Sequence, residues 1–345
     1  TTGANNTSVG RDSLKANTTG TRNIAIGAYA LDANTTDSDN TAIGYNACGA
    51  ANGAGQITGV GAYALSDVTT GNRNTAFGYN AGADITTADD NVALGASALD
   101  ACTTGGYNIA IGSHALGKSN GQQNVAVGYY ALEENTTASY NTAVGTEALT
   151  SNTTGHSNTA VGWKALYTNA TTSWNTAVGT QAAEKYIGNE IEAFGFQALK
   201  ECTTGIRNAA FGTYTLDACT TGVYNNAFGY SALSAVTTGR DNCAFGSSAL
   251  LVNTADGNSA FGYLSLNACT TGTGNCAFGY ASGGAVTTGD NNTAIGSGAN
   301  AGSTGNNNTS VGAAAGAAIT TGGNNTAIGH NALENNTTGS DNTAI

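Results

Sequence analysis

Large apolar residues recur along the chain within one short phrase, in which Asn and Thr precede an Ala, then Ile, Val or Phe, and finally a Gly. Residues 40–44 and 175–179 are two copies of this phrase. The closing glycines fall at positions 10, 27, 44, 61, 78, 95, 112, 128, 145, 162, 179, 195, 212, 229, 246, 262, 279, 296, 312 and 329. Fifteen of the nineteen intervals are 17 residues long and four are 16. A period this short and constant predicts a solenoid of about twenty stacked coils.

Each phrase alternates small and large side chains, which predicts a short β-strand with two different faces. The large residue before the Gly forms one column, with the members Ile26, Ile43, Phe77, Ile111, Val144, Val178, Phe211, Phe245, Phe278 and Ile328. The residue before it stays small in every copy, as in Ala25, Ala42, Ala76, Ala143, Ala177, Ala244 and Ala294.

We expect the large column to fill the interior of each coil as its structural core. An exposed strand face would carry larger residues than Ala, so the small column is expected to pack closely against a neighbouring subunit. The reverse orientation stays open, with Ala lining a very thin coil and the Ile, Val and Phe row forming the core between subunits. Either orientation favours an oligomer, because both faces are then buried.

A second pattern follows three residues after each closing Gly, where a small residue precedes Leu, as in Ala30 and Leu31. It predicts a second short strand, followed by a Thr-Thr-Gly turn whose Gly supplies a positive φ. The Asn that opens each phrase is absent only at Ile57 and Ile191, and we expect it to bond the backbone at a corner or to form an amide ladder. The predicted fold is therefore an all-β parallel β-solenoid, or β-roll, with two short strands per coil. Coils spaced by about 4.8 Å would give a rod on the order of 95 Å long.

Aromatic residues mark the position directly after the closing Gly, often in every second coil. Bulky rings on adjacent coils would crowd each other at about 4.8 Å, so the large residues alternate with small ones. We interpret this set as a surface aromatic column, with the members Tyr45, Tyr79, Tyr129, Trp163, Phe196, Tyr230 and Tyr263.

Composition narrows the class of protein further. The 345 residues include 50 Gly and no Pro, and only 9% are charged. The net charge of −12 argues against nucleic acid or an anionic membrane as partner, and no apolar run approaches the ~20 residues of a membrane span. Since nothing interrupts the period, residues 1–345 are expected to form a single continuous array, which we interpret as a segment of a longer fibre protein.

The sequence offers no constellation of catalytic groups. The histidines lie far apart, the cysteines form no Cys-x-x-Cys pair, and the turn glycines form no dinucleotide fingerprint. We therefore expect no enzyme activity, no cofactor and no metal site, and the cysteines are interpreted as small buried apolar residues. Only Cys202 and Cys219 fall in one column of adjacent coils, where a disulfide is geometrically conceivable.

The Asn-Thr-Ala-Ile/Val-Gly, Ala-Leu and Thr-Thr-Gly pattern resembles the head repeats of trimeric autotransporter adhesins and the repeat arrays of phage tail fibres. The resemblance extends over all 345 residues. It implies a left-handed parallel β-roll with three chains around one axis.

The resemblance and the lack of reactive groups together predict a structural role. We expect the homotrimeric shaft of an extracellular fibre, on a bacterial surface or a virion tail, which spaces a tip that binds host-surface glycans or receptors. Three alternatives stay open: a self-assembling extracellular filament, a glycan-binding surface that uses the aromatic column, and ice binding by the Thr-rich columns.

Overall fold

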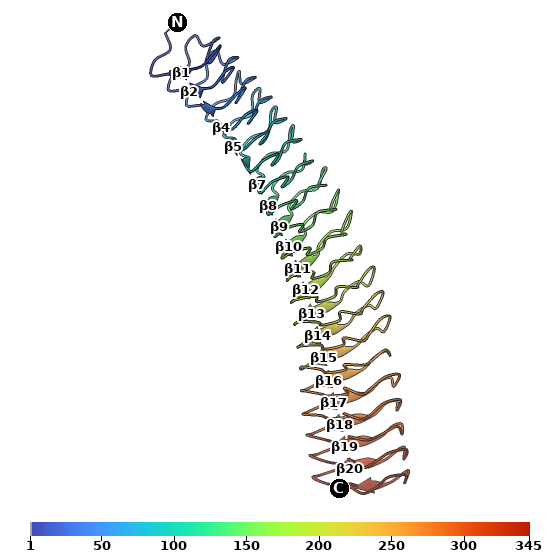
Figure 1. Cartoon of the computed structure of the whole chain (residues 1–345). Coiled ribbons are helices and arrows are strands. Elements are labelled where there is room, and N and C mark those ends of the chain that lie inside the picture. The colour runs from blue at the N-terminus through green and yellow to red at the C-terminus, as the bar shows by residue number, and fades with distance from the viewer. Residues whose placement is uncertain (1) are drawn as a thin grey trace. The chain divides into compact units, whose positions relative to one another are not determined.

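The computed structural model describes residues 2–345 as an all-β parallel β-solenoid of about twenty coils. The chain divides into two compact units, Thr1–Trp174 (unit 1) and Asn175–Ile345 (unit 2), which are described separately. Each repeat of the sequence phrase forms one strand, and Figure 1 shows the strands of each unit stacked along one side of successive coils.

Unit 1 contains the strands β1 (Thr7–Val9), β2 (Ile24–Ile26), β3 (Thr41–Ile43), β4 (Thr58–Val60), β5 (Thr75–Phe77), β6 (Val92–Leu94), β7 (Ile109–Ile111), β8 (Val125–Val127), β9 (Thr142–Val144) and β10 (Thr159–Val161). Unit 2 contains β11 (Thr176–Val178), β12 (Glu192–Phe194), β13 (Ala209–Phe211), β14 (Asn226–Phe228), β15 (Cys243–Phe245), β16 (Ser259–Phe261), β17 (Cys276–Phe278), β18 (Thr293–Ile295), β19 (Thr309–Val311), β20 (Thr326–Ile328) and β21 (Thr343–Ala344).

Within each unit, every strand pairs in parallel with the strand of the next coil, in register with the sequence repeat. Ala42 lies opposite Gly59 and Ile43 opposite Val60, for example. The small and large columns of the sequence are therefore columns in space, as the period predicts. The four 16-residue repeats keep this register, since their strands pair in the same way.

The second predicted strand does not form. The segment around Ala30 and Leu31 consists of successive turns, in which Ala30 N donates to Gly27 O at 3.3 Å and Asn34 N to Leu31 O at 3.3 Å. The φ angles of Tyr29 (62°) and Leu31 (50°) are positive, and this pattern recurs from coil to coil. Left-handed residues at every second position prevent an extended strand, so each coil has one strand and a long turn segment.

The strands do not have the preferred orientation, in which the large column fills the coil. They have the alternative orientation, with the Ala column inside the coil and the large column outside. The alanines of the small column are fully buried inside the coil, namely Ala25, Ala42, Ala76, Ala143, Ala177, Ala244 and Ala294. The large column, expected as the core, faces outward and is partly to well exposed, namely Ile26, Ile43, Phe77, Ile111, Val144, Val178, Phe211, Phe245, Phe278 and Ile328.

The physical reason is the thinness of the coil. A Cβ at Gly59, which stands in the Ala column, would lie 3.1 Å from Ala64 O and 2.6 Å from Cys48 Sγ on the opposite wall. A side chain as large as Ile does not fit into this space. The interior is instead filled by the small column together with the Ala and Leu of the turn segment, such as Ala64 and Leu65.

Interior volume is maintained within single coils. Where Gly replaces the buried Leu, a large β-branched residue stands three positions later, as at Gly82 with Ile85 and at Gly316 with Ile319. A Cβ at Gly82 would meet the Ile85 side chain at 3.0 Å. Such compensation is the behaviour of a close-packed core.

Two columns of glycine allow the coils to stack. The closing glycines all adopt a positive φ, between 122° at Gly329 and 143° at Gly44, which other residues rarely reach. The Gly of the Thr-Thr-Gly turn was expected to do the same, but Gly71 and its equivalents do not have a positive φ. They are small for a different reason, since a Cβ on Gly71 would lie 2.3 Å from Ala88 O of the next coil.

Candidate functional site: an exposed apolar strand face

The first and third residues of every strand point out of the coil and form what we call the outer strand face. Its first column is rich in Thr, and its third column contains only Val, Ile, Leu and Phe. Glu192 is its only charged residue among the described strands. An extended apolar face with so little charge is the kind of surface that marks an interaction site.

Phenylalanines gather on the outer strand face of unit 2. Six of them stack on successive strands, and the ring centroids of neighbours lie 4.4–5.2 Å apart. The rings are nearly parallel, with interplanar angles of 3–21°. The stack comprises Phe194, Phe211, Phe228, Phe245, Phe261 and Phe278. Phe278 is 56% exposed, although exposure of a Phe side chain to water is unfavourable.

The predicted aromatic column is exposed at every position, namely Tyr45, Tyr79, Tyr129, Trp163, Phe196, Tyr230 and Tyr263. In unit 1 its rings alternate with tyrosines one residue further along the chain. Tyr29, Tyr45, Tyr63 and Tyr79 meet edge to face, with centroids 5.3–6.1 Å apart. The alternation between two positions relieves the crowding expected between rings on adjacent coils, and it leaves a continuous aromatic stripe beside the strands.

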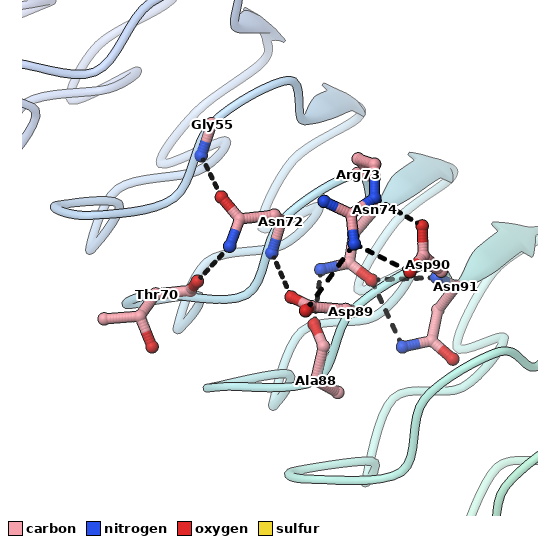
Figure 2. A network of polar contacts seen from close by, with 9 residues as sticks. All are labelled: Gly55, Thr70, Asn72, Arg73, Asn74, Ala88, Asp89, Asp90 and Asn91. Atoms are coloured by element: carbon pink, nitrogen blue, oxygen red, sulfur yellow. Dashed lines mark hydrogen bonds and ion pairs between the residues drawn. The ribbon is translucent and has the colours of Figure 1, made fainter.

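A buried ladder of asparagines lies at the corner directly before the strands and connects successive coils. Asn74 Oδ1 accepts a hydrogen bond from Asn91 N at 3.0 Å, and Asn74 Nδ2 donates to Ala88 O at 2.7 Å (Figure 2). Asn91 Nδ2 also donates to Asn74 Oδ1 at 3.1 Å. Both predicted roles, the corner bond and the amide ladder, are thus confirmed in one column. The left-handed residue of this corner is Arg73, directly before the Asn.

A second ladder lies on the surface next to the first. Gly55 N donates to Asn72 Oδ1 at 2.9 Å, and Asn72 N donates to Asp89 Oδ1 at 2.7 Å (Figure 2). Arg73 forms a bidentate pair with Asp90, and this hydrogen-bonded guanidinium lowers the pKa of the Asp90 carboxyl below its ordinary value. Polar side chains therefore connect successive coils at the surface, while the outer strand face is left without such partners.

The remaining reactive groups form no chemical centre among residues 2–345. No group of three or more His, Cys, Asp or Glu residues comes together there in a way that could hold a metal ion. No pocket is found within the described coils. The described chain also contains no helix that is both long and apolar enough to cross a membrane. Cys48, Cys102, Cys202, Cys219 and Cys269 are buried, Cys243 is half-buried and Cys276 is exposed.

The sequence predicts the outer strand face only in the alternative orientation, in which the Ile, Val and Phe row lies outside the coil and forms the core between subunits. The signal was present, because the Thr at the start of each phrase and the large residue at its end share one face of the predicted strand. The preferred orientation, with the Ala row toward another subunit, is wrong, because the Ala column lies inside the coil. The structure instead brings the Thr column and the large column together on the surface.

Comparison with known proteins adds no family to this description. No protein-family model matches the chain, and no curated protein matches it significantly. The chain is a parallel β-solenoid of 16- and 17-residue repeats.

Proposed function

We propose that the chain is the structural shaft of an extracellular fibre, in which copies of the chain associate through the outer strand face. The fibre would belong to a bacterial surface adhesin or to a phage tail-type fibre, and the chain would act as a spacer and adhesive scaffold, not as an enzyme. The observation that carries this proposal is the exposed, almost uncharged apolar face that runs along the strands of each unit.

The size of this face supports association. Large apolar side chains on this face are well exposed in both units, up to 58% at Val9 and 56% at Phe278, and contiguous exposed apolar surface of this kind marks interaction sites. Interfaces of stable complexes bury about 800 Å² on each partner. The in-register columns of the outer strand face allow the same apolar contact to repeat from coil to coil, so the area buried between copies of the chain grows with the number of coils that take part.

The proposed number of chains comes from the resemblance to trimeric β-roll heads. Three chains around one axis would place their outer strand faces against each other, and they would cover the Ile, Val and Phe column of each. This arrangement explains why the large column lies outside the coil in the single chain. Ala inside makes the coil thin, and the large column outside supplies the hydrophobic core of the assembly.

A pair of substitutions in unit 2 tests the interface. Phe245 lies on the outer strand face and is 37% exposed, and Val252 lies in the turn segment and is 38% exposed. Phe245→Lys should weaken association at least tenfold, because rotational symmetry would bring three ammonium groups to one level of an apolar interface. Val252→Lys should leave the association unchanged, since Lys118 and Lys185 occupy the equivalent position of other coils.

Concentration-dependent light scattering of the full chain gives the readout. The proposal expects a three-chain mass for the wild-type protein and for Val252→Lys, and a smaller mass for Phe245→Lys. A wild-type chain that remains a soluble monomer at all concentrations would overturn the proposed assembly. An equal loss of mass in both variants would place the interface elsewhere.

A second candidate function rests on the aromatic stripe. Tyr45 and Tyr79 belong to the ladder of exposed rings in unit 1, and rows of exposed aromatic rings can stack against sugar rings. If this stripe binds polysaccharide, the double variant Tyr45→Ala and Tyr79→Ala should reduce binding to chitin or cellulose at least tenfold in a sedimentation assay. Tyr140→Ala is the control, because Tyr140 is exposed but outside the ring ladder. Wild-type protein that binds none of the polysaccharides contradicts this function.

A further inference from the structure

Two buried thiols lie at equivalent places in adjacent coils of unit 2. Cys202 N donates to Leu199 O at 3.1 Å, and Cys219 N donates to Leu216 O at 3.1 Å, so both cysteines occupy the same turn. The following residues connect the two coils, since Thr203 N donates to Thr220 O at 2.9 Å. Both side chains point into the coil, where Cys202 and Cys219 are fully buried.

Each thiol donates a hydrogen bond within its own turn, Cys202 Sγ to Gly205 O at 3.6 Å and Cys219 Sγ to Gly222 O at 3.8 Å. The interaction between the two neighbouring thiols raises the pKa of Cys202 and lowers that of Cys219. Tyr186 and Val236 occupy the same column on either side of the pair and are also fully buried. No other two cysteines of the sequence share a column in adjacent coils.

The spacing of the coils suits a disulfide. Residues in register on neighbouring coils lie about 4.8 Å apart, and disulfides join Cα atoms that are about 4.4–6.8 Å apart. The backbone hydrogen bond of Thr203 fixes this register next to the thiols. A bond between the two sulfur atoms therefore needs a rotation of the side chains and a small approach of the two Cβ atoms, because disulfides join Cβ atoms that are about 3.5–4.5 Å apart.

We infer that Cys202 and Cys219 form an oxidisable staple, which closes a disulfide between two adjacent coils when the protein meets a peroxide. The thiolate of one of the two cysteines attacks hydrogen peroxide, and its sulfur becomes a sulfenic acid with release of hydroxide. The sulfur of the other cysteine then attacks the sulfur of the sulfenic acid and displaces the hydroxyl group. Two thiols and one peroxide give one disulfide and two waters, so the two electrons lost by sulfur reduce the peroxide. This inference concerns the single chain and does not depend on the proposed fibre.

The chain contains its own controls for this reaction. Cys102 and Cys269 occupy the same buried column, but their neighbours in adjacent coils are not cysteines. Burial raises the pKa of each of these thiols to about 11. They share the environment of Cys202 and Cys219 without a partner, so they should remain thiols under conditions that oxidise the pair.

Peptide mapping of the intact folded chain tests the inference. Trypsin cleaves after Arg207, between the two cysteines, and separates peptide 201–207 from peptide 208–240, each with one Cys. After peroxide treatment and alkylation in denaturant, we expect these peptides as one disulfide-linked species about 2 Da lighter than their sum. Reduction should restore both, and hydrogen exchange of the joined turns should be at least tenfold slower in the oxidised protein.

Variants make the outcome specific. Cys202→Ser should abolish the linked species and the slower exchange, whereas Cys102→Ser should retain both. The inference is wrong if the folded wild-type protein keeps Cys202 and Cys219 alkylatable after peroxide treatment. It is also wrong if Cys202 or Cys219 links to another cysteine as readily as to its neighbour.

Discussion

Gly61→Ala is expected to separate the coils of β4 and β5 and to cause a large local loss of stability. Gly61 has a φ of 134°, and a Cβ there would lie 2.3 Å from Gly78 O and 2.6 Å from Gly78 C. Backbone strain and overpacking each cost about 1–3 kcal/mol, so we expect a loss of about 3 kcal/mol or more in the local free energy of opening. This corresponds to roughly hundredfold faster hydrogen exchange of the β4 and β5 amides.

Hydrogen exchange is the right readout for this variant, because the stability of a stacked array is a sum of neighbour terms and unfolding is not all-or-none. Gly55→Ala is the matched control in the same region. Gly55 does not have a positive φ, and its Cβ would meet Asn72 Oδ1 at an ordinary 3.6 Å. Unchanged exchange in Gly61→Ala would mean that the coils do not stack as closely as described.

Asn225→Ala is expected to remove one asparagine from the buried ladder of unit 2 and to destabilise the stacking of the adjacent coils. Asn225 Oδ1 accepts from Asn242 N at 3.2 Å, and Asn225 Nδ2 donates to Gly239 O at 2.8 Å. The substitution leaves both backbone groups buried without these partners, and each costs about 1–3 kcal/mol. We therefore expect a loss of about 3 kcal/mol, which exchange of the β14 and β15 amides would report.

An asparagine at the surface gives the comparison. Asn306 Oδ1 accepts from Asp290 N at 2.8 Å, but Asn306 is exposed, so water can replace it in Asn306→Ala. We expect exchange in this variant to change less than tenfold. Equal effects in Asn225→Ala and Asn306→Ala would show that burial of the ladder contributes little.

Much of the fold follows from the repeat. The position of every strand, its register and the Asn ladder can be predicted, because a hydrogen-bonded stack repeats the geometry of one phrase. Ile57 shows how far this regularity extends, since Ile57 N still donates to Asn40 Oδ1 at 3.0 Å, even though Ile has no amide to continue the ladder.

The side on which each column lies could not be predicted from alternation. Alternation gives two faces, but the thickness of the coil decides which face is inside, and that thickness depends on the turn segment. There, Leu and Tyr adopt positive φ values that neither residue favours, as at Leu65 (52°) and Tyr63 (60°). The sequence pattern therefore predicts a second strand in a segment that forms turns. The coil that results is too thin to hold the large column.

Hydroxyl-radical footprinting of the intact chain in solution tests the central claim, that the outer strand face is covered by other copies of the chain. Phe278 on this face and Tyr230 in the aromatic column are each 56% exposed in the single chain. After correction for the intrinsic reactivity of each residue type, we predict at least tenfold protection of Phe278, whereas Tyr230 should be labelled at the rate expected for its exposure. Labelling of Phe278 at the rate expected for its exposure would show that other copies of the chain do not cover the outer strand face.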